Sequence, residues 1–594
     1  MHEETKQCQN CKSAFTIDAS DFSFYEKIKV PPPTWCPECR ARRRLAFWNM
    51  RNLYRRKEAL HGKEVFCTYP QEADIVIYDH DDWWSDVWDP FAYGKEADFS
   101  RPFLEQVKDL VHTVPWPSKS IQQMVDSDYS NQASRLKNCY LCFNGNDSKD
   151  CSYGVGFTKM ENCIDFYMTD LSQSSYELFW SSRCYECFYC ADCHDCRNVM
   201  FSKDCRNCQD CIGCVGLRNR KHCIFNVQYT KEEYEAKKKE LQIGSHKVIV
   251  GISQKVEMLS KKIPVKYMYG QKNANASGNY VYNSKNVRQS FEVVDCEDVA
   301  YSHNIGWNTK DCYDYDNWGL NSELIYDSVT VGENCHNVKF SFDCWPGCSD
   351  IEYSMNCHSS SDLFGCVGLR SKQYCILNKQ YTKENYFVVR DKIIEHMKKI
   401  PYVDAHNRTY RYGELFPPEF SPLAYTEAAV SDYYPLSKEE AVSQGFLWRD
   451  TSVRTFEVTL SANNLPDLIQ DVADSITKEK IGCVRCLRAY KITSHELDFY
   501  KRFTIPLPRQ CHNCRHLERM KLRNPLRLWH RQCQCAGTHS QPTTNNKQQQ
   551  DYRYTNTATH SHGAEPCPTE FETSYAPERP EIVYCGSCYN AEVA

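Results

Sequence analysis

Small and apolar residues recur at fixed short intervals through the middle of the chain. Cysteines stand at positions 139, 151 and 163, twelve apart, and then at 187, 196, 205, 214 and 223, nine apart. The nine-residue spacing returns at 348, 357, 366 and 375, with Asn, Asp and aromatic residues between the cysteines. Such periodicity is typical of solenoids. Pairs of nine- or twelve-residue half-coils predict about 18 or about 24 residues per turn of a parallel β-helix.

The periodic region occurs in two copies. Gly-Cys-Val-Gly-Leu-Arg occupies 213–218 and again 365–370. We therefore expect a mainly β protein with a parallel β-helix-like solenoid in the middle, in two parts at 131–229 and 276–381. The 14 cysteines of the first part and the 8 of the second are small enough for a narrow interior, which predicts reduced, inward-facing thiols.

Metal binding is the alternative role for the densest solenoid cysteines. Five of them, three residues apart, carry enough sulfur for a zinc ion or an iron–sulfur cluster: Cys184, Cys187, Cys190, Cys193 and Cys196. The corresponding positions in the second copy keep one thiol of five: His336, Lys339, Phe342, Trp345 and Cys348. This comparison favours packing over ligation, with Phe342 and Trp345 buried and Lys339 facing solvent.

Helical segments are expected around the solenoid parts. Thr230 and Ser437 each open a capping-box sequence with a Glu three residues later, and Thr382 opens a counterpart of the first. We expect a helical connector at 96–130 and a helical insertion at 230–275. A helix followed by an extended, Pro-rich strap is expected at 382–475.

A four-cysteine unit stands at both ends of the chain. Residues 8–56 match 483–531 without a gap. In each copy two Cys-x2-Cys knuckles follow one another at the same spacing, which lets four thiolates surround one zinc ion. A basic run follows, and in the first copy it lacks Gly and Pro and predicts a helix. The ligand sets are Cys8, Cys11, Cys36 and Cys39, and Cys483, Cys486, Cys511 and Cys514.

Both units resemble a bacterial zinc-ribbon domain family of the treble-clef type. The resemblance rests on the knuckles, a Phe-Thr strand at Phe15, the pair Phe24-Tyr25, a proline before the second knuckle and Arg40 directly after it. It implies a zinc ion and a treble-clef fold for 1–57 and for the first part of 476–594, but no reaction. The order of finger, cysteine-rich repeat, aromatic strap and finger resembles uncharacterised multidomain proteins of candidate-phylum bacteria.

The C-terminal copy continues into more cysteines. Two further thiolate pairs predict a third zinc ion on Cys533, Cys535, Cys585 and Cys588, with Cys567 as a competing ligand. The stretch 538–566 inside this unit is rich in Gln, Asn, Thr and His and is expected to be disordered. Its His560 and His562 are metal-ligand types, but a flexible tract of this kind seldom forms a defined site.

The N-terminal copy has lost every cysteine of that additional site. At 58–95 the corresponding positions hold Glu58, Leu60, Asp79 and Asp82, so we expect a degenerate, metal-free unit packed on tryptophans. The alternative is a rescued site on His61, Cys67 and His80. In total the sequence predicts three zinc ions.

Length and composition narrow the class of protein. The chain has 594 residues, 36 cysteines and a formal net charge of −5, so several domains are expected. No apolar run approaches a signal peptide or a membrane span. We therefore expect a cytoplasmic protein without membrane contact, in which reduced cysteines bind metal or lie buried. A leaderless secreted protein with disulfides is the alternative.

Basic residues gather behind the second knuckle of each finger. Eight Lys or Arg and no acid lie between Arg40 and Lys57, and six with one acid lie between Arg515 and Arg531. Arginine-rich helices with interleaved aromatics suit phosphate contact and base stacking. Alternatively, these arginines pair with the acidic segment 79–89. The nucleic-acid candidates are Arg40, Arg42, Arg43, Arg44, Trp48, Arg51, Arg55, Arg56, Arg515, Arg519, Arg523, Arg527 and Arg531.

Three functions follow from these patterns. The favoured one is a zinc-binding, non-catalytic protein that binds nucleic acid, RNA first, or a ribonucleoprotein. The alternative is a solenoid scaffold for protein partners. A carbohydrate-active β-helix enzyme is the third, with paired carboxylates drawn from Glu292, Asp295, Glu297, Asp298, Asp311, Asp314 and Asp316. No residue is assigned to catalysis or to an organic cofactor.

Overall fold

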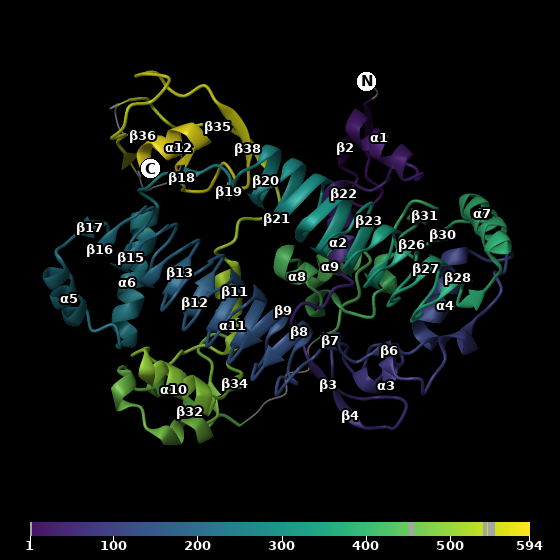
Figure 1. Ribbon diagram of the computed structural model, residues 1–594, viewed down its shortest axis with the longest axis horizontal. Helices are drawn as coiled ribbons and strands as arrows, with labels where there is room; N and C mark the ends of the chain where they lie inside the picture. Colours follow the sequence, from purple (N-terminus) through teal and green to yellow (C-terminus); the bar gives the residue numbers. More distant parts are fainter. Residues whose placement is uncertain (1–2, 451–456, 539–542, 545–552, 594) are drawn as a thin grey trace. The chain divides into compact units, whose positions relative to one another are not determined.

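The computed structural model describes residues 3–450, 457–538, 543–544 and 553–593. The chain forms two compact units, each containing one part of the solenoid and one finger (Figure 1). Unit 1 comprises residues 1–120, 268–450 and 526–528, and unit 2 comprises 121–267, 451–525 and 529–594. Each finger thus belongs to a unit whose solenoid part is remote from it in sequence.

The solenoid part of unit 2 is an 11-stranded sheet in which the strands follow chain order. All its pairs are parallel except the last. The strands are β7 (Ile121–Gln122), β8 (Asn131–Lys137), β9 (Phe143–Lys149), β10 (Ser152–Thr158), β11 (Ile164–Asp170), β12 (Tyr176–Phe179), β13 (Phe188–Ala191), β14 (Arg197–Met200), β15 (Gln209–Ile212), β16 (Lys221–Ile224) and β17 (Val227–Gln228). The predicted parallel β-solenoid is confirmed.

Each turn of this solenoid is short. Ile164 pairs with Tyr176 and Ile212 with Ile224, so one turn takes twelve residues. The larger turn predicted from pairs of half-coils is therefore wrong. Every third residue, such as Asn138, has a positive φ, which bends the chain sharply at that residue. Four three-residue segments, each with one such bend, make one turn. Cysteines nine residues apart are therefore separated by one turn minus one three-residue segment.

Inward positions recur every three residues and are filled mostly by small side chains, with larger ones such as Phe157, Phe166 and Leu178 between them. The 14 cysteines of this part are buried and free. The Cys184 thiol donates to the carbonyl of Cys193 at 3.4 Å, nine residues on, and the Ser175 hydroxyl accepts from the Cys187 amide at 3.1 Å. Among the residues that the structure describes, the thiol groups able to hold a metal lie outside the solenoid. Burial as thiols is therefore the role that the geometry supports.

The solenoid part of unit 1 is a second 11-stranded sheet. Its turns take eleven residues at its start, then twelve, thirteen in the middle, where Tyr313 pairs with Tyr326, and twelve again near its end. Its 8 cysteines are also buried and free. The strands are β19 (Gly270–Gln271), β20 (Ala274–Tyr282), β21 (Lys285–Ala300), β22 (His303–Gly319), β23 (Tyr326–Gly332), β24 (His336–Lys339), β25 (Phe342–Cys344), β26 (Ser349–Glu352), β27 (Ser361–Phe364), β28 (Gln373–Ile376) and β29 (Lys379–Gln380).

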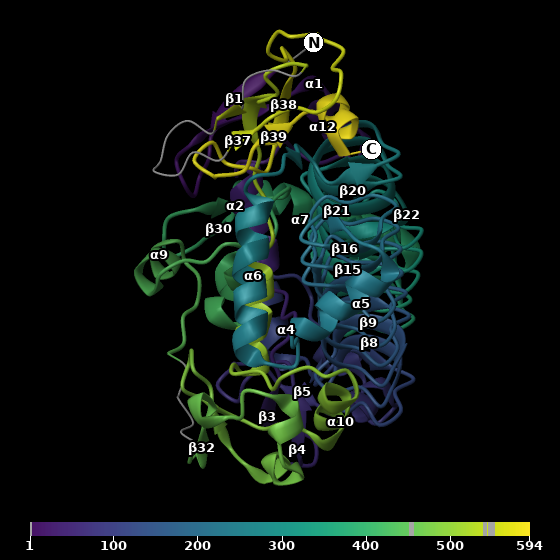
Figure 2. The same cartoon turned by 90° about the vertical axis from the view of Figure 1, so that its left-hand side faces the viewer.

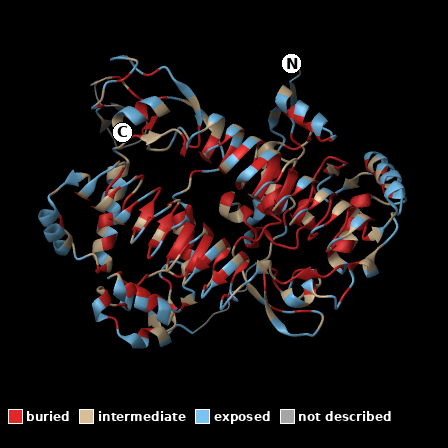
Figure 3. Ribbon diagram, in the orientation of Figure 1, coloured by how far each residue is buried: buried red, intermediate tan, exposed pale blue. Residues whose placement is uncertain are grey.

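Lys339 does not face solvent as predicted. It is buried, and its ammonium donates to the Ile28 carbonyl at 3.2 Å and lies 3.6 Å from Glu352. Phe342 and Trp345 are buried, as expected. Burial follows the solenoid strands in both units (Figure 3).

Each finger has a two-stranded or three-stranded sheet and two helices. Unit 1 has β1 (Glu4–Gln7), β2 (Ala14–Ile17), α1 (Ala19–Lys27) and α2 (Pro37–Leu45). Unit 2 has β32 (Leu460–Ser461), β33 (Ile481–Gly482), β34 (Ala489–Tyr490), α10 (Ser494–Arg502) and α11 (His512–Met520). The helix predicted after the second knuckle is present. The helix between the knuckles was missed, although Thr493 and Glu496 form a capping box there.

Unit 1 also contains the segments after its finger and after its solenoid part. Phe103–Thr113 forms the helix expected in the connector. The elements are β3 (Tyr54–Lys57), β4 (Glu64–Cys67), β5 (Ile77–Tyr78), α3 (His80–Trp84), η1 (Pro90–Tyr93), α4 (Phe103–Thr113), β6 (Trp116–Pro117), α7 (Lys383–Lys399), β30 (Tyr402–Val403), β31 (Thr409–Tyr410), η2 (Pro418–Phe420), η3 (Tyr425–Glu427), α8 (Val430–Tyr433) and α9 (Lys438–Ser443).

Unit 2 adds helices beside its solenoid and a C-terminal subdomain. Helix α5 (Lys231–Glu240) contacts β16 (Figure 2). The other elements are α6 (His246–Ser260), β18 (Val265–Lys266), η4 (Ala462–Asn464), η5 (Ile469–Asp471), η6 (Asp474–Lys478), β35 (Trp529–Gln532), β36 (Thr543–Thr544), β37 (Arg553–Tyr554), β38 (Glu570–Thr573), β39 (Val583–Tyr584) and α12 (Gly586–Val593). Across the described residues, no helix combines the length and apolarity needed to cross a membrane.

Candidate metal centres and the finger–solenoid interface

The two predicted finger sites are assembled. In each, the four sulfur atoms lie within 4.8 Å of one another. Cys11 Sγ is 3.7 Å from Cys36 Sγ, and Cys486 Sγ is 3.7 Å from Cys511 Sγ. A tetrahedron with zinc–sulfur bonds of about 2.3 Å has edges of about 3.8 Å, so these separations suit a zinc ion.

Backbone donors surround the finger sulfurs. The Cys36 amide donates to Cys8 Sγ at 3.3 Å, and the Cys511 amide donates to Cys483 Sγ at 3.3 Å. Burial raises the pKa of Cys483, but backbone N–H donors of Cys486 and Cys511 bring that pKa down to about 7. Donors of this kind favour the thiolate, which is the form that binds metal.

The third cysteine group differs from the predicted set in one member. Its sulfurs belong to Cys533, Cys567, Cys585 and Cys588. Pairing of β35 with β38 brings the chain near Cys567 alongside Cys533, and Cys567 Sγ lies 3.9 Å from Cys585 Sγ. The assignment of Cys535 to this group is therefore wrong, and the competing ligand Cys567 takes its place.

Cys535 joins a fourth group instead. Together with His560, His562 and Cys588 it places four ligand atoms within 4.8 Å of one another. The histidines come from the stretch predicted to be disordered, of which 539–542 and 545–552 lie outside the described residues. His560 itself is buried, and both histidines take defined positions in this group, where a flexible tract was expected. The sequence feature that could have indicated this group is the pair His560-x-His562, which lies between cysteines predicted to bind metal.

The degenerate N-terminal half replaces a thiolate with a carboxylate. Glu58 stands where the second copy has Cys533, and it accepts from the amides of Leu60 at 2.6 Å and His61 at 2.8 Å. Trp83 is buried in the same unit. Within the described residues, His61, Cys67 and His80 do not converge as a metal group. Hydrogen bonds and packing hold this segment without a cluster of metal ligands.

Finger arginines of unit 1 are buried against the solenoid. The Arg40 guanidinium lies 2.8 Å from Asp314. Arg44 lies 3.0 Å from Asp314, 2.5 Å from Asp316 and 3.1 Å from Asp327. All five side chains are almost completely inaccessible to solvent. Helix α2 thus meets β22 and β23 through a buried ionic network.

The finger of unit 2 makes the same kind of contact. Arg515 lies 2.7 Å from Asp165, and Arg519 lies 3.0 Å from Asp165 and 2.7 Å from Glu177. Tyr153 donates to Glu496 at 2.9 Å. Here helix α11 meets β11, which begins at Ile164.

The ion pairs that the two interfaces share correspond residue by residue. Arg40 and Arg44 correspond to Arg515 and Arg519 in the gap-free match of the two fingers. The motif Gly-Cys-Val-Gly-Leu-Arg occurs at 213–218 in unit 2 and at 365–370 in unit 1. Four turns before the residue that precedes this motif stand Ile164 in unit 2 and Tyr313 in unit 1. Asp314 therefore matches Asp165, and Asp327 matches Glu177. The finger and the solenoid surface that receives it were therefore duplicated together.

Aromatic contacts repeat across the two interfaces as well. Tyr25 lies 5.6 Å from Tyr326 in unit 1, and the corresponding Tyr500 lies 5.5 Å from Tyr176 in unit 2, as measured between ring centroids. Tyr301 donates to Asp21 at 3.0 Å, as Tyr153 does to Glu496. Both interfaces therefore combine charge pairing with the burial of aromatic rings.

This burial bears directly on the nucleic-acid candidates. Seven of the thirteen have buried side chains: Arg40, Arg43, Arg44, Trp48, Arg56, Arg515 and Arg519. Arg42, Arg51 and Arg55 are more accessible and pair with Glu38, Asp432 and Glu64. Arg523 and Arg531 are partly exposed and Arg527 is exposed. The acidic segment 79–89 is not the partner of Arg40, Arg43 and Arg44, whose carboxylates come mainly from the solenoid.

The carboxylates considered for glycoside chemistry are largely engaged in other pairs. Asp314 and Asp316 bind the finger arginines, as described above. Glu292 lies 3.1 Å from His303, Glu297 pairs with Lys285, and Asp311 pairs with Lys27. These contacts leave the carboxylates as structural partners and provide no argument for hydrolysis.

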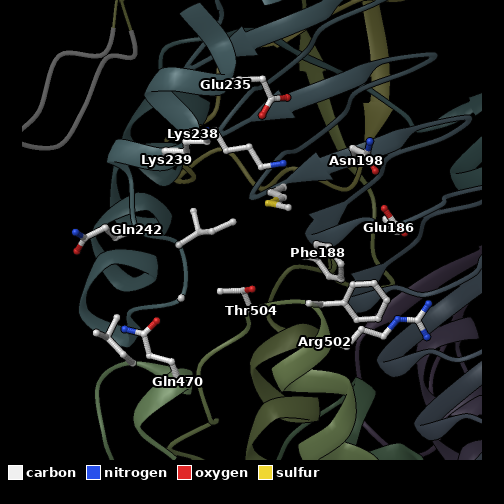
Figure 4. A pocket seen from close by; sticks show the side chains of 15 residues that line it. Glu186, Phe188, Asn198, Glu235, Lys238, Lys239, Gln242, Gln470, Arg502 and Thr504 are labelled. Atoms are coloured by element: carbon white, nitrogen blue, oxygen red, sulfur yellow. The ribbon is translucent and has the colours of Figure 1, made fainter. Parts of the chain in front are cut away.

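A separate pocket of about 610 Å³ lies in unit 2 between β13, β14, α5 and the end of α10 (Figure 4). Its lining includes the apolar side chains of Phe188, Met200 and Phe503 and the basic side chains of Lys238 and Arg502. Glu186, Glu235 and Lys239 add further charges. This lining suits a ligand with an apolar body and charged ends, and it contains none of the seven carboxylates considered above.

Comparisons with known proteins add no assignment. The chain matches no described protein family and no curated protein. Eleven solved chains match in structure. One, from Desulfovibrio desulfuricans G20 and provisionally identified as an acetyltransferase, shares 8% identity over 49% of this chain and 86% of its own length, with a TM-score of 0.10. That score is too low to support any argument about this protein.

Proposed function

We propose that this protein is a metal-stabilised, non-catalytic binding scaffold in which each finger fixes one part of the solenoid. The observation that carries the proposal is the duplicated burial of Arg40 with Asp314 and Arg515 with Asp165. The zinc-ribbon-like units then act as clamps within the chain, and the exposed solenoid surface is left for a macromolecular partner.

The metal ligands and the buried arginines are adjacent in sequence. Cys36 is the N-cap of α2 and Cys511 is the N-cap of α11. Cys39 and Cys514 directly precede Arg40 and Arg515. A zinc ion on the four thiolates therefore fixes the start of each helix and the direction of its arginines.

Loss of a finger would remove both the arginines that compensate the solenoid carboxylates and the cover that keeps water from them. Asp314 and Asp165 are fully inaccessible to solvent in their units. Their burial is tolerated because the finger arginines compensate their charge. Metal binding at the finger and stability of the neighbouring solenoid turns are thus coupled through the arginines.

Hydrogen exchange on the full chain tests the clamp. Removing metal with a strong chelator is expected to expose the amides of α2 and α11 and, together with them, those of β11, β22 and β23. The distant turn β27–β28 is the internal control and should keep its protection. Unfolding of both fingers with unchanged exchange in β11, β22 and β23 would overturn the proposal.

Nucleic-acid binding is the second candidate, supported by the exposure of Arg55 and Arg527. Its test is fluorescence anisotropy of single-stranded RNA with the metal-loaded chain over a range of salt concentrations. The scaffold proposal expects no binding that depends on these arginines. Tight binding with a steep salt dependence, lost on replacing Arg55 and Arg527 with Glu, would establish the nucleic-acid function instead.

A further inference from the structure

We propose that the C-terminal subdomain of unit 2 holds two metal ions that share the Cys588 thiolate. The third and fourth ligand groups have this one residue in common. The first ion would take Cys533, Cys567, Cys585 and Cys588, and the second would take Cys535, His560, His562 and Cys588. This site does not depend on the clamp function.

Distances place the ligand atoms of the second ion around one point. His560 Nδ1 and His562 Nε2 each lie 3.5 Å from Cys535 Sγ. His562 Nε2 lies 3.2 Å from Cys588 Sγ. Zinc bonds of about 2.0–2.3 Å to nitrogen and sulfur give separations of about 3.3–3.8 Å in a tetrahedron.

Both histidines are oriented by hydrogen bonds at the nitrogen that faces away from this point. His560 Nε2 lies 2.7 Å from Glu592 Oε1, and His562 Nδ1 lies 2.7 Å from the Glu565 carbonyl. Such partners fix the ring orientation and tautomer of metal-binding histidines. The Glu592 side chain is buried, and it also accepts from the Thr557 amide at 2.9 Å, so the carboxylate is itself held in place.

Cys535 has a comparable set of partners. The Asn556 amide group donates to Cys535 Sγ at 3.2 Å and to the Gly537 carbonyl at 2.6 Å. Tyr584 donates to the side-chain oxygen Oδ1 of Asn556 at 2.7 Å, which fixes the direction of the side-chain amide donor. This donor holds Cys535 Sγ in place beside the two histidines.

The number of ligands exceeds what one ion can use. Five cysteines and two histidines converge in the two groups, whereas a structural zinc ion takes four ligands. With all five sulfurs as thiolates, one divalent ion leaves a net charge of −3 on the site, and two leave −1. A second ion therefore removes most of the charge that burial makes unfavourable.

Metal content of the full chain, purified without added metal, tests the count. We expect four ions per chain, one in each finger and two here. Replacing His560 and His562 together with Ala should lower the content from four to three. The variant His530→Gln changes an exposed histidine of the same unit and should retain four. Retention of four ions by the double variant would overturn the proposal.

Cadmium-113 NMR of the intact, cadmium-loaded chain supplies a test that needs no variant. Three resonances should have chemical shifts typical of cadmium bound by sulfur alone, and one should have a shift typical of mixed nitrogen and sulfur ligation. The mixed resonance should show scalar coupling to one of the others through Cys588. Three resonances in total, or four without this coupling, would rule out the shared thiolate.

Discussion

Arg515 and Asp165 lie 2.7 Å apart, although 350 residues separate them in the chain. Arg40 and Asp314 repeat this relationship in unit 1 at 2.8 Å. In both cases the arginine directly follows a cysteine of the finger site. The duplicated pair explains why a basic helix that resembles a nucleic-acid surface in sequence is buried in the fold.

Replacing Asp165 with Asn should lower the free energy of unfolding of unit 2 by about 3–5 kcal/mol, because Arg515 and Arg519 would lose the charge that compensates their burial. Denaturant unfolding measures the change. The control is Asp195→Asn, which breaks an exposed pair with Arg183 on the same solenoid and should cost less than about 1 kcal/mol. Equal effects of the two variants would contradict the structural role of the buried pair.

The stability of unit 1 should depend on the ionisation of Asp343. Burial raises the pKa of this carboxyl to about 7, although a hydrogen bond from the Trp345 indole opposes the shift. The pKa of an unfolded Asp is about 3.9. Because the folded pKa is the higher one, the contribution of Asp343 to stability is complete below about pH 4 and is lost as the pH rises through about 7.

Asp343→Asn should therefore raise the free energy of unfolding at pH 8 and leave it nearly unchanged at pH 4. The side-chain oxygen can still accept from Trp345. Denaturant unfolding at the two pH values gives the comparison. Asp391→Asn, at an exposed position of α7, is the control and should show no such dependence. If Asp343→Asn changes the free energy of unfolding equally at both pH values, Asp343 is not the group whose ionisation makes stability depend on pH.

Left-handed corner residues of the solenoid should tolerate Gly better than β-branched side chains. Asn207 has a φ of 50° and its amide donates to Asn219 in the next turn at 2.7 Å. Asn207→Val should destabilise unit 2 by about 1–2 kcal/mol beyond the loss of that hydrogen bond, since Cβ branching opposes this backbone conformation. Asn207→Gly removes the same hydrogen bond without this strain and should be less destabilising. Thermal unfolding ranks the two variants.

Solenoid thiols should be protected from modification in the folded chain. Thiol titration is expected to show the 22 solenoid cysteines, 14 and 8 in the two parts, as unreactive until denaturant is added. Cys187→Ser should be tolerated, because serines already occupy inward positions such as Ser175, while Cys187→Leu should cost about 1–3 kcal/mol by overpacking. Disulfide bonds among these cysteines, found by mass mapping, would contradict the buried-thiol account.

Local spacing in the sequence was sufficient to predict the elements that are formed by residues close together in the chain. The four-cysteine knuckles predicted both finger groups, because closely spaced thiolates on a tight turn reach one ion. Periodicity predicted a solenoid, but cysteines sample only some of the inward positions. Ser175 and Leu178 occupy others. The twelve-residue spacing of Cys139, Cys151 and Cys163 equals one full turn, as the pairing of Ile164 with Tyr176 shows, but the shorter spacing elsewhere led both to be interpreted as half-coils.

Tertiary structure alone decided which finger contacts which part of the solenoid. The chain has 77 Asp and Glu residues, and nothing local distinguishes Asp314 or Asp165 as the partner of an arginine far away in the chain. The third and fourth ligand groups were undecided for the same reason: Cys533 and Cys535 are close neighbours in sequence, yet folding sends their sulfurs to different groups. Spacing constrains neighbours along the chain, whereas burial and charge compensation select partners only after the chain has folded.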